Sequence, residues 1–335
     1  MRTVSCLLRT ALLVFLLSAA SAVSALADNL VVTIDAGHGG AEDGATAVYD
    51  GKLIREKDLN LAIANALREE LLTYEDVTVY MTRESDQTVS LEDRTALADE
   101  HESDLLISLH NNAEGDAQDY TSGTSVLISS GQYYPELADC EAVLGELINE
   151  ELHSGPGTRA RGLLRRLSSS STYPNGALAD YYALIRDSTQ RGFPAVIVEH
   201  AFLDDENDYR SFLSSDKKLR ALGTADATAI AKHFGLSKKD GSVSYEAVGC
   251  RIRMLSRHWM RKNGARYYIC DDGSYKTGWF RTGDYTYYFK PSGAAATGLL
   301  FLTGEDAGTY FFADNGRLLT SWHVGSDKKL VFHPT

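Results

Sequence analysis

Cysteine, positive charge and long apolar runs are all scarce in this chain of 335 residues. The formal net charge is −13, which excludes the general basic surface that nucleic-acid binding requires. The same acidity argues against bulk attraction to anionic polymers, so ligands of that kind would need specific pockets. The sequence also lacks H-E-x-x-H, which excludes the metallopeptidases that bind zinc through that helical motif.

Of the four cysteines, Cys6 lies near the N-terminus and the others are Cys140, Cys250 and Cys270. An odd count in the remaining chain is not typical of a disulfide scaffold. A pair between Cys250 and Cys270 is one alternative. We expect free, partly buried thiols instead.

One apolar run stands at the N-terminus, where Arg2 and Arg9 flank the start of a segment from Ala11 to Leu17. That segment is too short to span a bilayer, and Ala25-Leu26-Ala27 has the small-x-small form of a cleavage site. We therefore expect residues 1–27 to be a signal peptide. An uncleaved N-terminal anchor is the alternative, and no other run is long enough to hold the chain in a membrane.

Apolar strands and amphipathic helices alternate from Leu30 to Phe234. This alternation predicts one large domain, of a size typical of an enzyme, over residues 28–236. The pattern favours an α/β fold with a mostly parallel, twisted sheet covered by helices on both faces. The expected strands are Leu30–Ile34, Val77–Met81, Leu105–Leu109, Ser125–Ser129 and Ala195–Val198. The expected helices are Asp58–Leu72, Leu91–Glu100, Pro135–Leu152 and Asp216–His233.

Residues 237–257 read as a polar linker, and residues 258–335 differ from the rest of the chain. Four positions recur there at intervals of about 20 residues, and the first three are followed in register by an aromatic pair and a glycine turn, while the last unit is truncated. They are Trp259, Trp279, Leu299 and Trp322. This period predicts a small all-β repeat domain of stacked β-hairpins, because one hairpin alone cannot bury its aromatic side chains.

Polar side chains follow three of the apolar strands, where open α/β sheets place their chemistry. His38 stands in D-A-G-H-G-G, His110 in S-L-H-N-N, and Glu199 ends the strand A-V-I-V, while Glu56 opens the amphipathic stretch E-K-D-L-N-L. Two histidines and a glutamate are a common catalytic zinc set, and a further glutamate suits a proton carrier. More ordinary roles are a turn-capping His38 and a Glu56 that merely favours a helix start.

These motifs, in this order, resemble the zinc-dependent N-acetylmuramoyl-L-alanine amidases, the third sequence type of peptidoglycan amidases. The resemblance runs from about Leu30 to Phe234 and includes Thr82-Arg83 and Arg94. It implies one Zn²⁺ per chain on His38, Glu56 and His110. It also implies that zinc-activated water, with Glu199 as general base and acid, cleaves the amide between N-acetylmuramic acid and L-alanine. The family often has Gly-Phe where this chain has Ala201-Phe202.

Three further residues are weaker candidates for orienting ligands or substrate: Asp35, Asn112 and Arg186. Asp35 is expected to accept the ring proton of His38, although an ordinary turn-forming role competes with this. His200 is expected to point away from the site, because neighbours in a strand face opposite sides of the sheet.

The C-terminal repeats are similar to wall-binding repeats of the choline-binding type, but Leu299 stands where an aromatic is expected. Trp279, Tyr287 and Tyr288 are the candidates for a cage that binds a quaternary ammonium group. The whole chain is thus expected to be a secreted, cell-wall-associated bacterial autolysin that acts on peptidoglycan. The alternatives are a wall-binding protein with a degenerate amidase domain, and a zinc peptidase that cuts the stem peptide. We expect a chain that ends near Phe234 to fold alone.

Overall fold

The computed structural model describes residues 29–114, 122–283, 285–319, 321–324 and 330–333. The expected signal peptide, residues 1–27, lies outside the described residues. Within them, no helix combines the length and apolar character needed to cross a membrane.

A six-stranded sheet forms the centre of the first domain, with strand order β4-β1-β5-β10-β6-β7. Its strands are β1 (Leu30–Ala36), β4 (Val77–Met81), β5 (Leu105–Asn112), β6 (Thr124–Leu127), β7 (Ala160–Leu164) and β10 (Ala195–Phe202). Neighbouring strands are parallel except β10 and β6. The prediction of a mostly parallel sheet is therefore confirmed.

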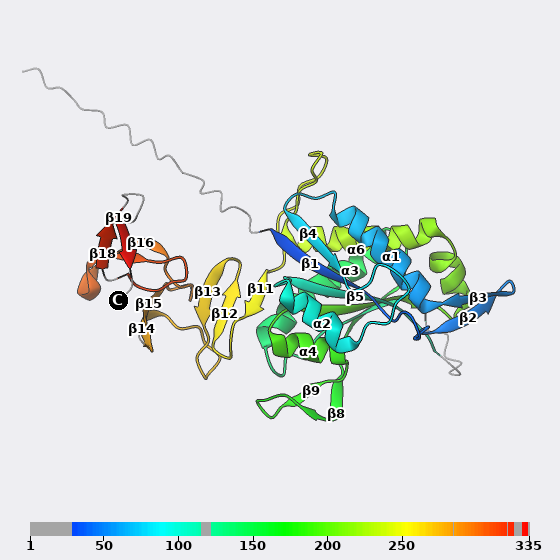
Figure 1. Cartoon of the computed structure of the whole chain (residues 1–335), viewed down its shortest axis with the longest axis horizontal. Helices are drawn as coiled ribbons and strands as arrows, with labels where there is room; N and C mark the ends of the chain where they lie inside the picture. The colour runs from blue at the N-terminus through cyan, green and yellow to red at the C-terminus, as the bar shows by residue number, and fades with distance from the viewer. Residues whose placement is uncertain (1–28, 115–121, 284, 320, 325–329, 334–335) are drawn as a thin grey trace, which may run out of the picture.

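Helices cover both faces of this sheet (Figure 1). One face carries α1 (Glu56–Leu71), α3 (Pro135–Ser154) and α6 (Asp216–Phe234), and the other carries α2 (Leu91–Glu100) and α4 (Ala183–Arg191). Apolar side chains recur every four residues along α1, as predicted, and Ile63, Leu67 and Leu71 are fully buried against the sheet. The start of α2 is fixed by Ser90, whose hydroxyl accepts the backbone N–H of Asp93 at 3.1 Å.

Several short elements were not predicted. They are β2 (Thr46–Tyr49), β3 (Lys52–Arg55), β7, β8 (Leu167–Thr172), β9 (Leu178–Asp180), α4, α5 (Glu206–Asp208) and the π-helical turn η1 (Tyr209–Leu213). The strand β8 contains four consecutive serines, so it shows no apolar alternation. Such exposed hairpins pair through the backbone, which leaves little trace in the sequence pattern.

The predicted hairpins are present in the C-terminal region, in the predicted register. They are β12 (Trp259–Lys262) with β13 (Ala265–Tyr268), β14 (Gly278–Thr282) with β15 (Tyr285–Phe289), β16 (Gly298–Leu302) with β17 (Gly308–Phe312), and β18 (Ser321–Val324) with β19 (Leu330–His333); a 3₁₀ turn, η2 (Gly304–Asp306), joins the third pair. Trp259 lies opposite Tyr268, and Trp279 lies opposite Tyr288. Consecutive hairpins touch through their rings, since the centroids of Trp259 and Tyr287 are 4.9 Å apart.

Residues 237–257 do not form the free linker that was expected. Strand β11 (Ile252–Met254) lies inside that range and pairs with β12. Met254 N donates to Gly192 O at 2.7 Å, and Arg251 forms an ion pair with Asp104 at 2.6 Å. The first repeat sheet thus packs directly on the α/β domain, because its apolar residues share a cluster with the start of α3.

The cysteine expectations also need correction. Cys140 on α3 and Cys250 are joined as a disulfide, with their Cα atoms 5.8 Å apart, and Cys270 is the free thiol. The alternative that paired Cys250 with Cys270 is therefore wrong, and only Cys270 is the free thiol that was expected. The reason is tertiary, because the chain around Cys250 runs along α6, where His233 Nε2 lies 3.1 Å from the Cys250 carbonyl.

The first repeat contacts the residues that immediately precede three of the parallel strands. Arg251 contacts Asn29 O and Asp104, which precede β1 and β5, and Met254 contacts Gly192, which precedes β10. The first repeat therefore docks at the amino ends of these strands, and Figure 1 shows the hairpins extending away from that edge. The carboxyl ends of these strands lie at the other end of the sheet, roughly 25 Å away, which is the length of a seven-residue strand.

Candidate active site

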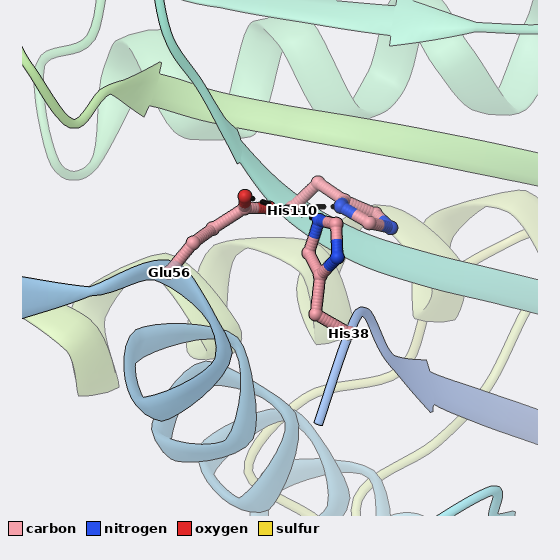
Figure 2. Close-up of side chains that lie close together, drawn as sticks. All are labelled: His38, Glu56 and His110. Carbon is pink, nitrogen blue, oxygen red and sulfur yellow. Dashed lines mark hydrogen bonds and ion pairs between the residues drawn. The ribbon is translucent and has the colours of Figure 1, made fainter. Parts of the chain in front are cut away.

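His38, Glu56 and His110 meet at the carboxyl ends of β1 and β5 and the first turn of α1 (Figure 2). One ligand atom from each residue lies within 4.8 Å of the others. Glu56 Oε2 is 3.1 Å from His38 Nε2, and Glu56 Oε1 is 2.8 Å from His110 Nδ1. Residues separated by up to 72 positions in sequence thus converge on one carboxylate.

The turn that carries His38 has an unusual backbone. His38 itself adopts φ +59°, which is uncommon for a side-chain-bearing residue and is often found at functional sites. A Cβ atom on Gly37 would overlap the His110 ring, and one on Gly44 would overlap Glu56 and His38. Glycine at these two positions therefore allows the three side chains to approach one another.

Two buried arginines hold this turn from behind. Arg83 donates from Nε to Ala36 O at 2.8 Å and from Nη2 to Gly37 O at 3.0 Å. Arg94 donates from Nη2 to His38 O at 2.9 Å and from Nη1 to Ala36 O at 3.0 Å. The T-R motif and the later arginine thus act through the backbone, because charged donors satisfy carbonyls that the turn leaves unpaired.

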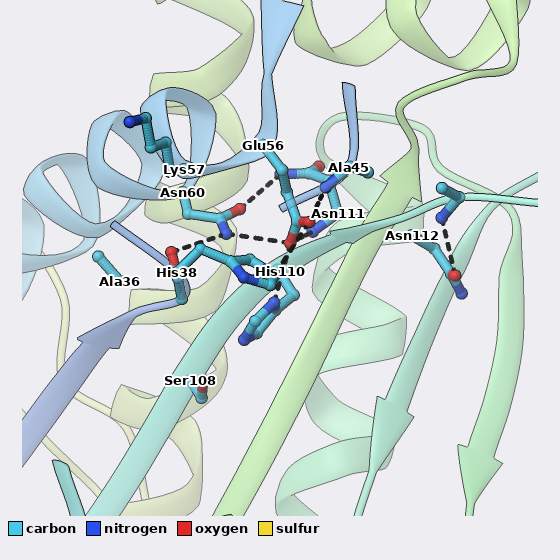
Figure 3. Close-up of polar contacts among 12 residues, drawn as sticks. Ala36, His38, Ala45, Glu56, Lys57, Asn60, Ser108, His110, Asn111 and Asn112 are labelled. Carbon is cyan, nitrogen blue, oxygen red and sulfur yellow. Dashed lines mark hydrogen bonds and ion pairs between the residues drawn. The ribbon is translucent and has the colours of Figure 1, made fainter. Parts of the chain in front are cut away.

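Glu56 is fixed by a network that Figure 3 shows around its carboxylate. Asn60 Nδ2 donates to Oε1 at 3.1 Å, Asn111 N donates to Oε1 at 3.2 Å, and Ala45 N donates to Oε2 at 2.8 Å. Asn111 also donates to Asn60 at 2.9 Å. Sequence reasoning gave neither asparagine a role, although one helical turn separates Glu56 from Asn60, which was a usable signal.

The charges at this cluster favour an ionised Glu56. Burial alone would raise the pKa of Glu56, but its hydrogen bonds with His110 and His38 lower it well below the ordinary range. Burial alone would lower the pKa of His110, but Glu56 raises it to about 9. Glu56 is therefore anionic and stabilises a proton on His110, and a metal cation would take the place of that proton.

Glu199 lies beside the cluster, directly opposite His110 in the pairing of β10 with β5. Its Oε2 atom is buried and has no hydrogen-bond partner among the described residues. Burial raises the pKa of Glu199, although the nearby His110 opposes this shift. A buried carboxyl with a raised pKa and a free oxygen is suited to taking and giving a proton.

His200 points to the other side of the sheet, as expected. Its Nε2 lies 2.9 Å from Asp226 on α6, and its Nδ1 lies 3.0 Å from the His110 carbonyl oxygen. Both His200 and Asp226 are fully buried. The pair therefore fixes the backbone of His110 from behind the sheet, which makes His200 a positioning residue.

The three weaker candidates have other partners. Asp35 does not accept from the His38 ring; it accepts from Thr82 and Ser108, both at 2.6 Å, and pairs with Arg94. It thus acts on His38 only through that arginine. Asn112 accepts from its neighbour Ala113 at 2.9 Å and lies apart from the Glu56 network (Figure 3).

Arg186 is also not turned toward the cluster in the way expected of a substrate ligand. Its Nη1 donates to Asp180 O at 3.2 Å, and its Nε lies 3.5 Å from Asp187. A pocket of about 440 Å³ opens over the cluster, and its walls come from the turn after β1, the segment before α2 and the start of α4. Its lining includes His38, His110 and Tyr182 but not Arg186.

The predicted aromatic cage in the repeats is divided between two faces. The rings of Trp279 and Tyr288 are 5.1 Å apart, and Trp279 also lies 4.8 Å from Tyr310 of the next hairpin. Tyr287 is buried on the other face and packs against Trp259. Trp279, Tyr287 and Tyr288 therefore do not surround one common ligand position, because adjacent strand residues alternate sides.

The side chains of His38, Glu56 and His110 are chemically suited to bind a metal ion. Two imidazoles and one carboxylate are a donor set typical of an open zinc site. Backbone and amide donors orient the carboxylate, and the nearby unpartnered Glu199 oxygen could accept a hydrogen bond from water beside a bound ion. The fold and the site together define an α/β enzyme whose chemistry lies at the carboxyl ends of parallel strands.

The comparisons with known proteins agree with this class. The family model described as N-acetylmuramoyl-L-alanine amidase matches residues 32–232, and the chain belongs to that enzyme family. The repeats lie beyond the matched range.

Individual relatives cover the same region. The chain is 31% identical over 210 residues to the N-acetylmuramoyl-L-alanine amidase CwlM of Bacillus licheniformis, covering 62% of this chain and 70% of the relative. It is 30% identical over 216 residues to a sporulation-specific N-acetylmuramoyl-L-alanine amidase of Bacillus subtilis, covering 64% and 72%. An N-acetylmuramoyl-L-alanine amidase structure from Clostridium difficile 630 superposes with a TM-score of 0.51 at 25% identity, covering 62% and 97%.

Proposed function

We propose that this protein is a secreted zinc-dependent peptidoglycan hydrolase that cleaves the amide between N-acetylmuramic acid and L-alanine. The observation that carries the proposal is the convergence of His38, Glu56 and His110 beside the buried, unpartnered oxygen of Glu199. Membership of the amidase family supports the choice of bond. His38, Glu56 and His110 would hold one zinc ion per chain.

Zinc, when bound, supplies Lewis acidity that polarises a carbonyl and lowers the pKa of water. Glu199 takes the proton of the attacking water, because its free oxygen faces no competing donor. The same carboxyl then gives that proton to the departing L-alanine amine. Burial, which raises the pKa of Glu199, favours holding the proton between the two steps.

Two alternative functions would involve the same four residues. A zinc peptidase would need the same cluster but would place a peptide bond of the stem over Glu199. A degenerate wall-binding protein would be expected to lack at least one member of the set. All four residues are present, and hydrogen bonds orient Glu56 and His110, which favours an active enzyme.

The N- and C-terminal segments carry the remaining proposals. Residues 1–27 are proposed as a signal peptide that exports the chain, and residues 28–236 as the zinc amidase domain. The hairpins are proposed to attach the enzyme to the cell wall, through choline or another wall polymer. The paired rings of Trp279 and Tyr288 support this, because aromatic faces attract quaternary ammonium groups.

The decisive experiment identifies the bond that opens. Purified peptidoglycan is digested with the zinc-loaded mature protein, and the products are analysed by mass spectrometry. The proposal expects intact stem peptides with a free L-alanine amine and glycan strands with a free lactyl carboxyl group. New amino termini further along the stem would establish the peptidase, and no product from metal-loaded protein would establish the degenerate alternative.

A further inference from the structure

An arginine-rich segment includes an edge strand that begins near the candidate active site. Residues 159–166 contain four arginines, and no aspartate or glutamate occurs from residue 152 to residue 179. This is a local excess of positive charge in a chain with a net charge of −13. All four arginines are exposed. One of them lies within β7, an edge strand of the central sheet, and the other three directly precede or follow it.

The pairing of the strands brings one end of β7 close to Glu199. Glu199 lies opposite Ser125 on β6, and the neighbouring Thr124 lies opposite Ala160 on β7. Strands in a sheet are about 4.8 Å apart, so the start of β7 is about 10 Å from Glu199. The other end of β7 points toward the opposite edge of the sheet.

A bulge in β7 changes the direction of one of the arginine side chains. The pairing of β7 with β6 shifts by one residue between Ala160 and Leu163, and Gly162 within the shift has φ +87°. Leu163 packs into the apolar core beneath α3. Without the bulge, Arg161 would share that direction. Bulges next to active sites commonly redirect a side chain in this way.

Arg161 accordingly lies over the ring of Phe202, with its guanidinium carbon 5.1 Å from the ring centroid. Phe202 follows Glu199 by three residues on β10. The ring contact restrains the guanidinium without using its N–H donors. Among the described residues Arg161 has no ion pair, whereas the nearby Arg166 is stacked on Tyr181.

We propose that Arg161 is a substrate-binding residue that recognises a carboxylate of the stem peptide; this rests on the proposed amidase function. The anion must come from the peptide, because the lactyl carboxyl group of muramic acid is consumed in the amide that is cleaved. An extended peptide advances about 3.3 Å per residue, so about 10 Å corresponds to roughly three residues beyond the cleaved bond. A guanidinium pairs with a carboxylate through two parallel hydrogen bonds.

The test compares two soluble muramoyl peptides, one with free stem carboxylates and one with the same groups converted to amides. Binding to the zinc-loaded full chain is measured in the Glu199→Gln background, so the result does not depend on which bond is cut. We expect Arg161→Ala to weaken binding of the carboxylate form about tenfold, the usual worth of a charged hydrogen bond, and to leave the amide form unchanged. KM should rise by a similar factor in the active enzyme, with kcat nearly constant.

Arg165→Ala is the matched control, because Arg165 is equally exposed but follows the far end of β7. It should bind both peptides as the parent does, and both variants should keep the parent's thermal stability and zinc content. Equal effects of Arg161→Ala on the carboxylate and amide forms would overturn the proposal. So would a loss confined to intact walls, which would assign Arg161 to a different anionic polymer. Cleavage at another bond with carboxylate-dependent binding intact would overturn the proposed function alone.

Discussion

The α/β domain and the repeat hairpins bury their apolar side chains to very different extents. In β1, Val32 and Ile34 are completely buried between two helical layers. In β16, Leu299 and Phe301 are 55% and 69% exposed. A closed core holds catalytic side chains in one geometry, whereas open hairpins present apolar surface that a ligand or partner can cover.

The two regions also occupy opposite ends of the same strands. The candidate active site lies at the carboxyl ends of β1, β5 and β10, and the first repeat docks near their amino ends. The candidate active site and the docked first repeat are thus separated by about the length of the sheet, roughly 25 Å. Under the proposed function, the enzyme would be held at one place on the wall and cut at another.

Removal of the metal should have the largest effect and should distinguish the two regions completely. Chelation, or His110→Ala, should abolish amide hydrolysis because the proposed zinc ligands are lost. Wall binding through the repeats should be unchanged. Added zinc should restore the chelated parent but not the variant, and His153→Ala, a histidine away from the site, should behave as the parent in metal analysis and product assays. Active protein that contains no zinc would contradict the proposal.

Glu199→Gln should lower activity by about 10²–10⁴-fold, the usual contribution of general acid–base catalysis. The amide has a similar shape but cannot carry the proton. Zinc content should remain that of the parent, because the three proposed ligands, His38, Glu56 and His110, are unchanged. Product formation and bound metal are measured on the same preparations. Loss of zinc from this variant would make Glu199 a ligand instead.

Truncation should show where the two regions separate. A chain ending at Phe234 loses Ile252, Met254 and Met260, which are buried against the start of α3. Burial of each such side chain is worth about 1.5–3 kcal/mol, so Tm should fall by more than about 5 °C. The shortened chain is still expected to fold, with a lower Tm than the full protein.

A chain ending at Lys276 is the matched comparison, because it keeps β11–β13 and the Cys140–Cys250 bond. It should unfold near the temperature of the full protein. Both shortened chains should cleave soluble muropeptides, and both should act poorly on intact walls because fewer hairpins hold them there. Equal thermal stability of the two truncations would show that the docked sheet does not stabilise the α/β domain.

The smallest expected effect concerns Glu141 of α3, which is buried and accepts hydrogen bonds from Ser129 and Ala195. Burial raises the pKa of Glu141 from 4.5 to about 7. The folded state thus holds this proton more tightly than the unfolded state, so the associated stability is complete below about pH 4.5 and is lost as pH rises through about 7. The change amounts to about 3 kcal/mol at most.

Glu141→Gln cannot titrate and should remove that part of the pH dependence, although it should also lower stability at every pH by disturbing the donors around it. The measurement is the free energy of unfolding by denaturant between pH 4.5 and pH 8. Glu136→Gln, on the first turn of the same helix, is the control. A slope identical to that of the parent would mean that Glu141 does not carry the coupling.

The fold was largely predictable because its main elements have strong local patterns. Ile63 and Leu67 recur on one face of α1, and β4 begins with three consecutive β-branched residues, so both elements appeared where expected. The β8 serines and the short β2–β3 hairpin gave no such pattern. Pairing across hairpins and docking of β11 depend on partners far away in sequence, which no local period records.

The sequence by itself determined the chemistry available: two imidazoles and two carboxylates placed at strand or helix ends, and aromatic rings spaced for hairpins. Only the tertiary structure decided which groups meet. It placed Asp35 against Arg94 instead of His38, joined Cys140 to Cys250, and turned Arg161 over Phe202. The physical reason is that residue type and local period act over one or two turns, whereas these contacts arise from packing between segments that many residues separate.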